Sequence, residues 1–314
     1  SLAKRSSKMK NTSKQRIITV VKLPTTLSPM PNFNTSITAR KSRVASSRWA
    51  ILFILTLGLS TSLKPAEANV PQDTSLRARL LLAQKSRNAP ASLRTLLTQI
   101  DAAANRRNVG GVMNFYSPRF VHGDGLNRAS MSKALTSLWK RYPNLRYTTK
   151  VESWKTQGDS IIADTVTNIV GLPSANKDKL GMNSIIKSRQ RIVNGKIIRQ
   201  DILSERTQLS SGINPPKVNI KLPEKLKAGQ RYYFDAIVNE PLGDDFLLGA
   251  ALDETVQPGK YLKPTPVNLE LLSAGGIFKV GRAPTTPGNQ WISAVLVRGN
   301  GMTMITQRVQ VVGR

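Results

Sequence analysis

The only histidine in the sequence, His122, lies two residues before Asp124 in the stretch 113–126. Histidine titrates near neutral pH and a nearby carboxylate raises its pKa, so the two residues have the chemistry of an acid–base pair. Gly123 and Gly125 flank Asp124, however, and Asp-Gly is a common turn sequence. A turn would give His122 a structural or surface role, so the sequence leaves both roles open.

A second candidate acid, Asp164, lies within an apolar segment. A buried carboxylate with a raised pKa would suit proton abstraction in an isomerase or a dehydratase. The alternative is that Asp164 points outward and pairs with Arg189 or Arg191 on a neighbouring strand. Asp164 and His122 are therefore the candidate catalytic residues, and the sequence assigns neither of them that role.

Four basic residues lie on two segments that we expect to form a hairpin: Lys187, Arg189, Arg191 and Arg199. Such side chains can form a basic stripe that binds anionic groups through charge-assisted hydrogen bonds. Cross-strand pairs with Asp164, Asp201 or Glu205 are the ordinary explanation for charges at these positions. The two interpretations remain open.

The composition excludes several classes of site. The sequence has no cysteine, which rules out disulfides, thiolate nucleophiles and cysteine metal sites. A single histidine does not make a usual zinc or haem site. The sequence also lacks G-x-S-x-G, Walker A and G-x-G-x-x-G motifs. We expect neither a metal nor a cofactor.

Three helices are predicted around these candidate residues. Ser92 can cap a first helix, because apolar residues recur at helical spacing over 93–104. A short second helix is expected over 110–116. A third amphipathic helix starts near Ser130 and stops at Pro143, which cannot continue a helix.

Four strands are predicted to follow, over 145–155, 160–170, 182–193 and 196–207, because these segments are rich in β-branched and aromatic residues. Asn194-Gly195 between the last two is a strong signal for a type I′ hairpin turn. Helices followed by antiparallel strands indicate an α+β fold, with three helices packed on one face of a curved antiparallel sheet.

The order of these elements, the segment SPRFVHGDG at 117–125 and the segment NGKIIRQDI at 194–202 resemble the nuclear transport factor 2-like superfamily, which includes SnoaL-like proteins. The resemblance covers residues 91–209 and includes no catalytic motif. It implies a cone-shaped fold with a pocket inside. The residues that it implies as pocket lining, besides His122 and Asp164, are Phe115, Tyr116, Phe120, Trp139, Tyr142, Tyr147, Trp154 and Gln200.

Residues 213–314 have the pattern of an all-β domain after a boundary at Asn214-Pro-Pro216. Alternating segments are separated by Gly/Pro turns, over 218–222, 231–238, 246–252, 266–272, 277–280, 290–297 and 302–312. Short strands at this spacing are typical of an immunoglobulin-like β-sandwich. The whole arrangement is similar to exported two-domain proteins of cyanobacteria.

Residues 1–68 have the features of a basic extension followed by a secretory signal peptide. Basic residues precede the apolar run 49–59, and an A-x-A cleavage site ends at Ala68. We expect translation to start at Met30, cleavage after Ala68 and a linker over 69–90. The alternative is an uncleaved membrane anchor, although the apolar run is short for a bilayer span.

Within residues 69–314, the positive charge is concentrated in the first part, 69–210. Residues 69–210 contain 23 basic and 9 acidic residues, whereas 211–314 contain 12 and 8. A solvated surface is the ordinary interpretation, and an anionic partner such as lipid headgroups or an acidic protein is the alternative. Nucleic acid is not expected as a partner, because an export signal removes the chain from it.

These observations are consistent with three functions. We expect an exported, non-catalytic binding or scaffold protein of the periplasm or the thylakoid lumen, whose cone domain takes a small molecule or a protein partner. The alternatives are a pocket enzyme that uses Asp164 or His122, and a peripheral module on an anionic membrane or wall surface. Apolar residues on both faces of the predicted strands also suggest a homodimer through the sheet of the middle domain.

Overall fold

A computed structural model describes residues 89–171, 181–263, 265–299 and 301–313. In these ranges three α-helices come first: α2 (Ala91–Asn105), α3 (Val109–Met113) and α4 (Arg128–Arg141). The buried residues of α2 include Leu93, Leu96 and Leu97, which are the predicted apolar face. The second helix ends at Met113, earlier than expected, because Tyr116 already belongs to strand β1 (Tyr116–His122).

Helix α4 begins at a capping box. The Asn127 side chain accepts a hydrogen bond from the Ser130 backbone N–H, and the Ser130 hydroxyl accepts one from the Asn127 backbone N–H, both at 2.9 Å. This reciprocal pair satisfies two backbone donors that the start of a helix leaves free. The helix therefore starts at Arg128, slightly before the position that the apolar spacing predicted.

Four long antiparallel strands follow: β2 (Leu145–Gln157), β3 (Ser160–Gly171), β4 (Gly181–Val193) and β5 (Lys196–Gly212). Asn194 and Gly195 join β4 to β5 with φ angles of 47° and 70°. Both are left-handed values, as the central residues of a type I′ turn require. The predicted hairpin is confirmed.

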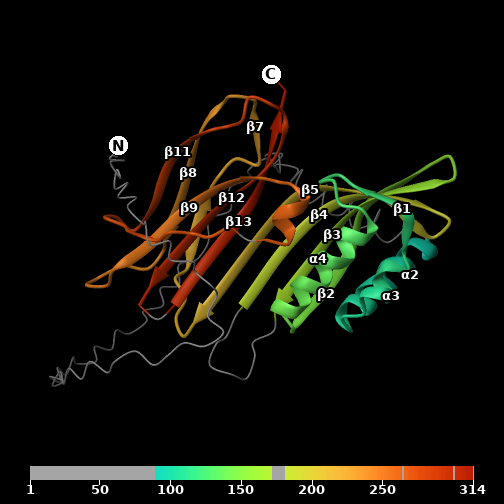
Figure 1. Cartoon of the computed structure of the whole chain (residues 1–314), viewed down its shortest axis with the longest axis horizontal. Coiled ribbons are helices and arrows are strands. Elements are labelled where there is room, and N and C mark those ends of the chain that lie inside the picture. The colour runs from blue at the N-terminus through green and yellow to red at the C-terminus, as the bar shows by residue number, and fades with distance from the viewer. Residues whose placement is uncertain (1–88, 172–180, 264, 300, 314) are drawn as a thin grey trace, which may run out of the picture.

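The C-terminal part adds the remaining strands and a 3-10 helix, with these bounds: β6 (Val218–Lys221), β7 (Lys225–Lys227), β8 (Arg231–Val238), β9 (Leu247–Thr255), η1 (Pro258–Tyr261), β10 (Glu270–Leu271), β11 (Gly276–Arg282), β12 (Gly288–Arg298) and β13 (Gly301–Val312). The strands form one ten-stranded sheet, in which β10-β9-β12-β13-β5-β4-β3-β2 are successive neighbours, β1 pairs with β5 and β7 pairs with β13. A separate three-stranded sheet has the order β11-β8-β6. Figure 1 shows the large sheet running through the molecule.

The predicted fold class is wrong. We expected an α+β cone domain followed by a separate all-β immunoglobulin-like sandwich, but the structure is mainly β and β5 pairs with β13. Strand β5 continues past its predicted end to Gly212, and Gly301–Gln307 pair with this extension and the residues before it. The edge of a strand presents free backbone N–H and C=O groups that can pair with any extended segment. The side-chain pattern of β5 therefore does not reveal that β13 is its partner.

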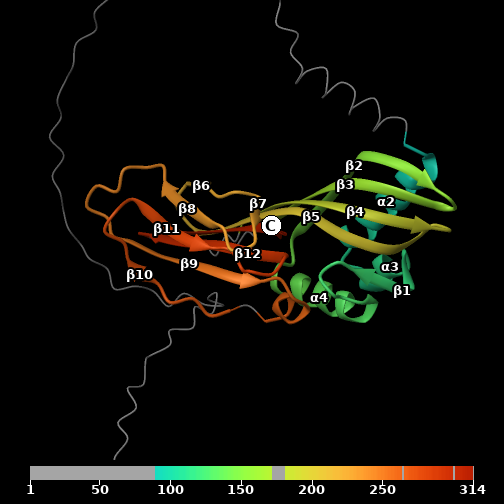
Figure 2. The same ribbon diagram turned by 90° about the horizontal axis from the view of Figure 1, so that it is seen from above.

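The two ends of the large sheet have different cores. At one end, α2, α3 and α4 pack on Val151, Ala163 and Ile192 of β2, β3 and β4. We call this side of β2–β5 the helix-covered face and the other side the open face. At the other end, the three-stranded sheet packs on β12 and β13 through Phe234, Ile292 and other apolar residues. Figure 2 shows the helices and the three-stranded sheet at opposite ends of the molecule.

The predicted signal peptide, its cleavage site and nearly all of the predicted linker lie outside the described residues. Among the helices of the described ranges, none is long and apolar enough to cross a membrane.

Candidate functional site

Asp124 lies in a turn after β1 and is almost fully buried, with a side chain that is 3% exposed. Arg308 of β13 donates two hydrogen bonds to its carboxylate, at 2.9 and 2.8 Å. The Tyr261 hydroxyl of η1 donates a third at 2.5 Å. Three donors thus occupy the carboxylate that we considered as the acid–base partner of His122.

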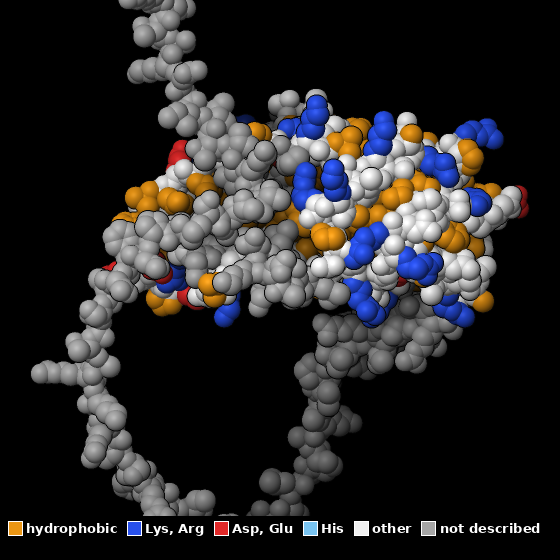
Figure 3. Space-filling model, turned by 60° about the horizontal axis from the view of Figure 1, so that its bottom comes forward, with side chains coloured by type: hydrophobic (Ala, Val, Ile, Leu, Met, Phe, Trp, Pro, Cys, Tyr) orange, Lys and Arg blue, Asp and Glu red, His pale blue; other side chains and the backbone are white. Residues whose placement is uncertain are grey.

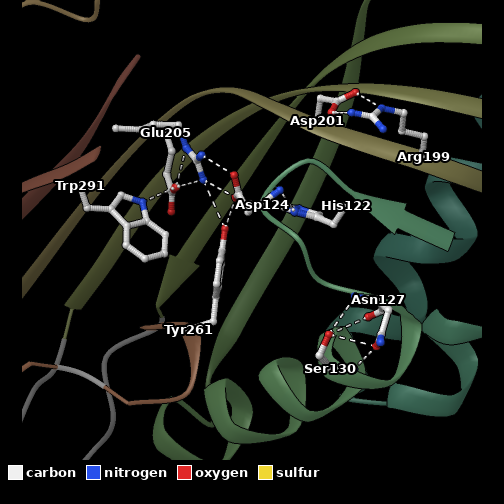
Figure 4. Close-up of polar contacts among 10 residues, drawn as sticks. His122, Asp124, Asn127, Ser130, Arg199, Asp201, Glu205, Tyr261 and Trp291 are labelled. Carbon is white, nitrogen blue, oxygen red and sulfur yellow. Dashed lines mark hydrogen bonds and ion pairs between the residues drawn. The ribbon is translucent and has the colours of Figure 1, made fainter. Parts of the chain in front are cut away.

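A second carboxylate completes this cluster from β5. Glu205 accepts hydrogen bonds from the Arg308 guanidinium at 3.2 Å and from the indole N–H of Trp291 at 2.9 Å. The Arg308 guanidinium carbon also lies 5.8 Å from the centre of the Trp291 ring, within the range of a cation–π contact. Figure 4 shows Asp124, Glu205, Tyr261 and Trp291 converging on one point. We call these four residues and Arg308 the buried ion-pair cluster.

The charges in this cluster stabilise one another. Burial alone would raise the pKa of Asp124, but the hydrogen bonds and charge of Arg308 outweigh it and hold that pKa below its usual value. Burial would lower the pKa of Arg308, yet its carboxylate partners raise it. Burial and the two carboxylates raise the pKa of Tyr261. At neutral pH the Asp124 carboxylate is ionised and Tyr261 keeps its proton as a donor.

His122 is buried next to the cluster as a neutral ring. Its Nδ1 atom accepts a hydrogen bond from the Asp124 backbone N–H at 3.1 Å, which leaves the ring proton on Nε2. Burial lowers the pKa of His122 despite the opposing charge of Asp124. The ring packs edge-on against Phe120 and Tyr261. His122 and Asp124 therefore form a tight turn with no shared proton.

Asp164 lies on the open face and is also paired. The Arg189 guanidinium donates two hydrogen bonds to its carboxylate, at 2.8 and 2.9 Å. These bonds are the main cause that lowers the pKa of Asp164, and burial opposes them only in part. The raised pKa that proton abstraction would require is not found here.

A groove of about 450 Å³ lies beside this pair. Its lining comes from β2 to β5 and consists of Ser153, Trp154, Lys155, Gln157, Ile162, Asp164, Arg189, Arg191, Arg199 and Asp201. Three of the four predicted anion-binding residues are in this set. The fourth, Lys187, lies outside the lining and pairs with Glu152 at 2.9 Å.

The register of the strands sorts the charges of the groove into two rows. In the first row, Arg189 lies opposite Asp164 on one side and Asp201 on the other. In the second row, successive neighbours across the strands are Lys155, Ile162, Arg191 and Arg199. We call this second set the cationic row, because it contains no acid.

Two charges of the cationic row, those of Lys155 and Arg191, have no acidic partner among the described residues. The third, Arg199, is paired, because it donates hydrogen bonds of 2.8 and 2.6 Å to Asp201 in the first row. Arg191 makes a hydrogen bond of 3.3 Å to the Gln157 side-chain oxygen. Across the described ranges, no carboxylate lies within 4 Å of the charged group of Arg191 or Lys155. These two cations remain available to an anion.

The residues expected to line a pocket are mostly core residues. Tyr116, Phe120, Trp139, Tyr142 and Tyr147 are buried, and Phe115 and Trp154 pack against them. The Trp139 indole N–H donates to the Tyr147 hydroxyl at 2.8 Å. Gln200 accepts a hydrogen bond from the Tyr116 hydroxyl at 3.3 Å. Of the eight, Trp154 is the one in the groove lining.

Sequence reasoning missed Arg308 and Tyr261 as partners of Asp124, and Trp291 as a partner of Glu205. One signal was available, because Arg308 is a charged residue inside a long strand that is otherwise uncharged. A charge at such a position requires a buried partner. The identity of that partner depends on the β5–β13 pairing, which the sequence pattern does not contain.

The comparisons with known proteins assign no activity to the chain. A family model described as "Domain of unknown function (DUF8623)" matches residues 213–312, and no curated protein matches the sequence. Similar solved structures include Bd1075 of Bdellovibrio bacteriovorus, with 17% identity over 35% of this chain and 38% of its own, at a TM-score of 0.26. The match thus spans well under half of the Bdellovibrio protein.

Two further structures are shorter proteins. One is described as a SnoaL-like polyketide cyclase from Shewanella putrefaciens CN-32, with 12% identity, 46% of this chain, 92% of its own and a TM-score of 0.27. The other is an LEH-like epoxide hydrolase from M. tuberculosis, with 10% identity, 34% of this chain, 78% of its own and a TM-score of 0.26. TM-scores this low carry no argument about mechanism.

Proposed function

We propose that the protein is an exported, non-catalytic binding protein that takes a small anionic molecule into the groove on the open face. The cationic row carries this proposal. It places Arg191 and Arg199 directly opposite each other on adjacent strands, with Lys155 in the same row beyond Ile162. Like charges directly opposite each other destabilise a sheet, and a bound anion offsets that cost.

The ion pairs around the row support the same conclusion. Arg189 and Arg199 are each held by a carboxylate through two hydrogen bonds, so these side chains have defined orientations before a ligand arrives. Preorganised donors reduce the ordering cost of binding. Ile162 supplies apolar surface in the same groove. A ligand with a phosphate or carboxylate group and an apolar part suits this lining.

The surface charge also favours anionic ligands. Figure 3 shows one face of the molecule, on which lysine and arginine side chains gather over the half that holds the helices while few acidic side chains appear. A surface of one sign raises the local concentration of oppositely charged ligands and speeds their association.

The environments of the candidate catalytic residues support a binding role over an enzymatic one. Asp164 and Asp124 are each engaged by a guanidinium, and His122 is buried and neutral. A general base needs lone pairs that are free to reach the substrate. We further propose export to the periplasm or the thylakoid lumen, and functional units that correspond to residues 91–209 and 213–314.

The test is titration of the full chain with inorganic pyrophosphate by calorimetry at low salt. Arg191→Gln should weaken binding by about tenfold or more, since a hydrogen bond to a charged group contributes roughly 1.5–3 kcal/mol. Lys187→Gln is the matched control, because Lys187 is on the same strand but outside the groove lining and paired with Glu152. Binding should be almost unchanged in this control.

Equal effects of the two substitutions, or no binding of pyrophosphate by the full chain, would rule out an anion site at the cationic row. A dimer through the open face is the competing proposal. Sedimentation velocity distinguishes the two, because a dimer would depend on protein concentration and not on pyrophosphate.

A further inference from the structure

The outward face of the three-stranded sheet has three large apolar side chains in contact with solvent. Tyr233 of β8 is 70% exposed, and Phe278 and Val280 of β11 are 60% and 50% exposed. Alternate residues of β8, such as Phe234, are buried against the large sheet. The exposed set therefore lies on the side of the three-stranded sheet that has no other layer of described residues.

These side chains form one continuous patch. Tyr233 lies directly opposite Val280, and Phe278 lies opposite Asp235, two residues along from Tyr233. Groups at neighbouring positions on one face of a sheet are within contact distance of each other. Large contiguous apolar patches are uncommon on monomeric soluble proteins and usually mark an interaction surface.

Basic residues lie at both ends of the patch. Arg231 lies directly opposite Arg282 at one end, and Lys221 lies opposite Asp235 at the other. Arg282 donates a hydrogen bond to the Gly229 carbonyl at 3.0 Å. Within the described part of the chain, no carboxylate approaches the Arg231 or Arg282 guanidinium within 4 Å. Directly opposed like charges destabilise a sheet, and an anionic partner removes that cost.

We propose that this surface, formed by Tyr233, Phe278, Val280, Arg231, Arg282 and Lys221 and here called the aromatic–basic face, docks on an anionic lipid membrane. Aromatic side chains favour the boundary between headgroups and acyl chains. Arginines beside them bind headgroup phosphates through paired hydrogen bonds. The combination of apolar tips and flanking basic residues is that of a peripheral membrane surface.

The charges also favour a membrane over a second copy of the chain. In a twofold dimer through this face, the Arg231–Arg282 pairs of both copies would be brought into one interface without acidic partners. Among the described residues of the three-stranded sheet, Asp235 is the one acid on this face, and it lies opposite Lys221. An anionic lipid surface complements the same charges at every position.

The test is sedimentation of the full chain with phosphatidylcholine vesicles that contain or lack phosphatidylglycerol, at low and high salt. We expect binding to the anionic vesicles that high salt weakens, because exposed charges are screened. Phe278→Ser should reduce the partition coefficient by about tenfold, as should Arg231→Gln combined with Arg282→Gln.

The matched controls remove an exposed aromatic side chain or two exposed positive charges outside the aromatic–basic face. Phe246→Ser alters an aromatic residue that is 76% exposed in the β8–β9 connection. Lys133→Gln with Lys140→Gln removes two exposed charges from α4. Both controls should bind vesicles like the unmodified chain. Arg191→Gln in the groove should also leave vesicle binding unchanged, so that failure of this proposal is distinct from failure of the groove proposal.

Equal losses in the test and control variants would assign vesicle binding to general charge or to other segments, and would overturn the proposal. Loss of self-association in Phe278→Ser, with vesicle binding unchanged, would show that a second copy occupies this face. Capture of acidic peptides but not of anionic vesicles would show that the face binds protein. Thermal melts of all variants verify folding.

Discussion

The carboxylates of Asp124 and Asp164 each accept two hydrogen bonds from one guanidinium, but their surroundings differ. Asp124 and Arg308 are 3% and 1% exposed, whereas Asp164 and Arg189 are 22% and 54% exposed. Removing one partner of a buried pair leaves an uncompensated charge, and exposed pairs contribute little. The first pair therefore stabilises the fold, and the second orients a side chain in the groove.

Because the sequence has one histidine, the pH dependence of folding stability near pH 6.5 can be traced to a single residue, His122. Burial lowers the folded-state pKa of His122 below the ordinary 6.5, so the unfolded chain binds a proton first as the pH falls. The stability from this residue is complete above pH 6.5 and is lost as the pH falls from about 6.5 toward the folded pKa. His122→Asn, which keeps an acceptor near Nδ1, should flatten the stability profile in this window.

The measurement is urea unfolding of the two proteins at several values between about pH 7.5 and 5.5. The difference between them removes the contribution of carboxylates that titrate in both. Parallel profiles would mean that His122 is neutral or charged to the same extent in both states, contrary to its burial.

At the scale of elements, the sequence specifies turns and helix starts through local signals, but it does not specify which strands pair. The Asn194-Gly195 turn requires left-handed backbone at two residues, and few residue types supply it. The helix α4 starts where Asn127 and Ser130 satisfy each other's backbone donors. The partner of the outer edge of β5 has no such local signal, and only the folded chain brings β13 to it.

The cap of α4 is an element whose contribution can be measured. Asn127→Ala removes the side-chain acceptor for the Ser130 N–H and should destabilise the protein by about 1 kcal/mol. Asn127→Ser keeps a capping oxygen and should lose much less. Urea midpoints with unchanged slopes give the comparison, and an equal loss for alanine and serine would show that the cap hydrogen bond contributes nothing.

At the scale of the whole molecule, the buried ion-pair cluster links segments that are distant in the sequence. Asp124 follows β1, Glu205 belongs to β5, Tyr261 to η1 and Arg308 to β13. The cluster lies where the strands of the helix-bearing end meet those of the C-terminal end. We therefore expect the two ends to unfold together.

Arg308→Met tests this coupling. It leaves the buried Asp124 and the partly buried Glu205 without their cation and should cost roughly 3–5 kcal/mol. Hydrogen exchange should then accelerate both in β3 and in β12, on either side of the cluster. Arg189→Met is the matched control, because it breaks a bidentate pair on the exposed side of the same sheet and should cost less than about 1 kcal/mol. Faster exchange in β12 alone would show that the ends are independent.

The sequence by itself determined the local structure of this protein. Pro143 and the apolar spacing specified where helices lie, alternation specified most strands, and Asn194-Gly195 specified one hairpin. These signals are local, because they act through backbone angles and through which face of an element is apolar. Composition also excluded cysteine chemistry throughout the chain.

The tertiary structure alone decided the pairing of β5 with β13 and the partners of each charge. Backbone hydrogen bonds between strands are nearly independent of side-chain identity. The alternation of apolar and polar residues is therefore compatible with two folds: an α+β domain followed by a separate sandwich, or one continuous sheet. The sequence offered Asp124 as one possible partner of His122 because the two are close in the chain, but in the fold its carboxylate accepts hydrogen bonds from Arg308, 184 residues away. Electrostatic energy depends on distance in space and on burial, and both quantities exist only after the strands have paired.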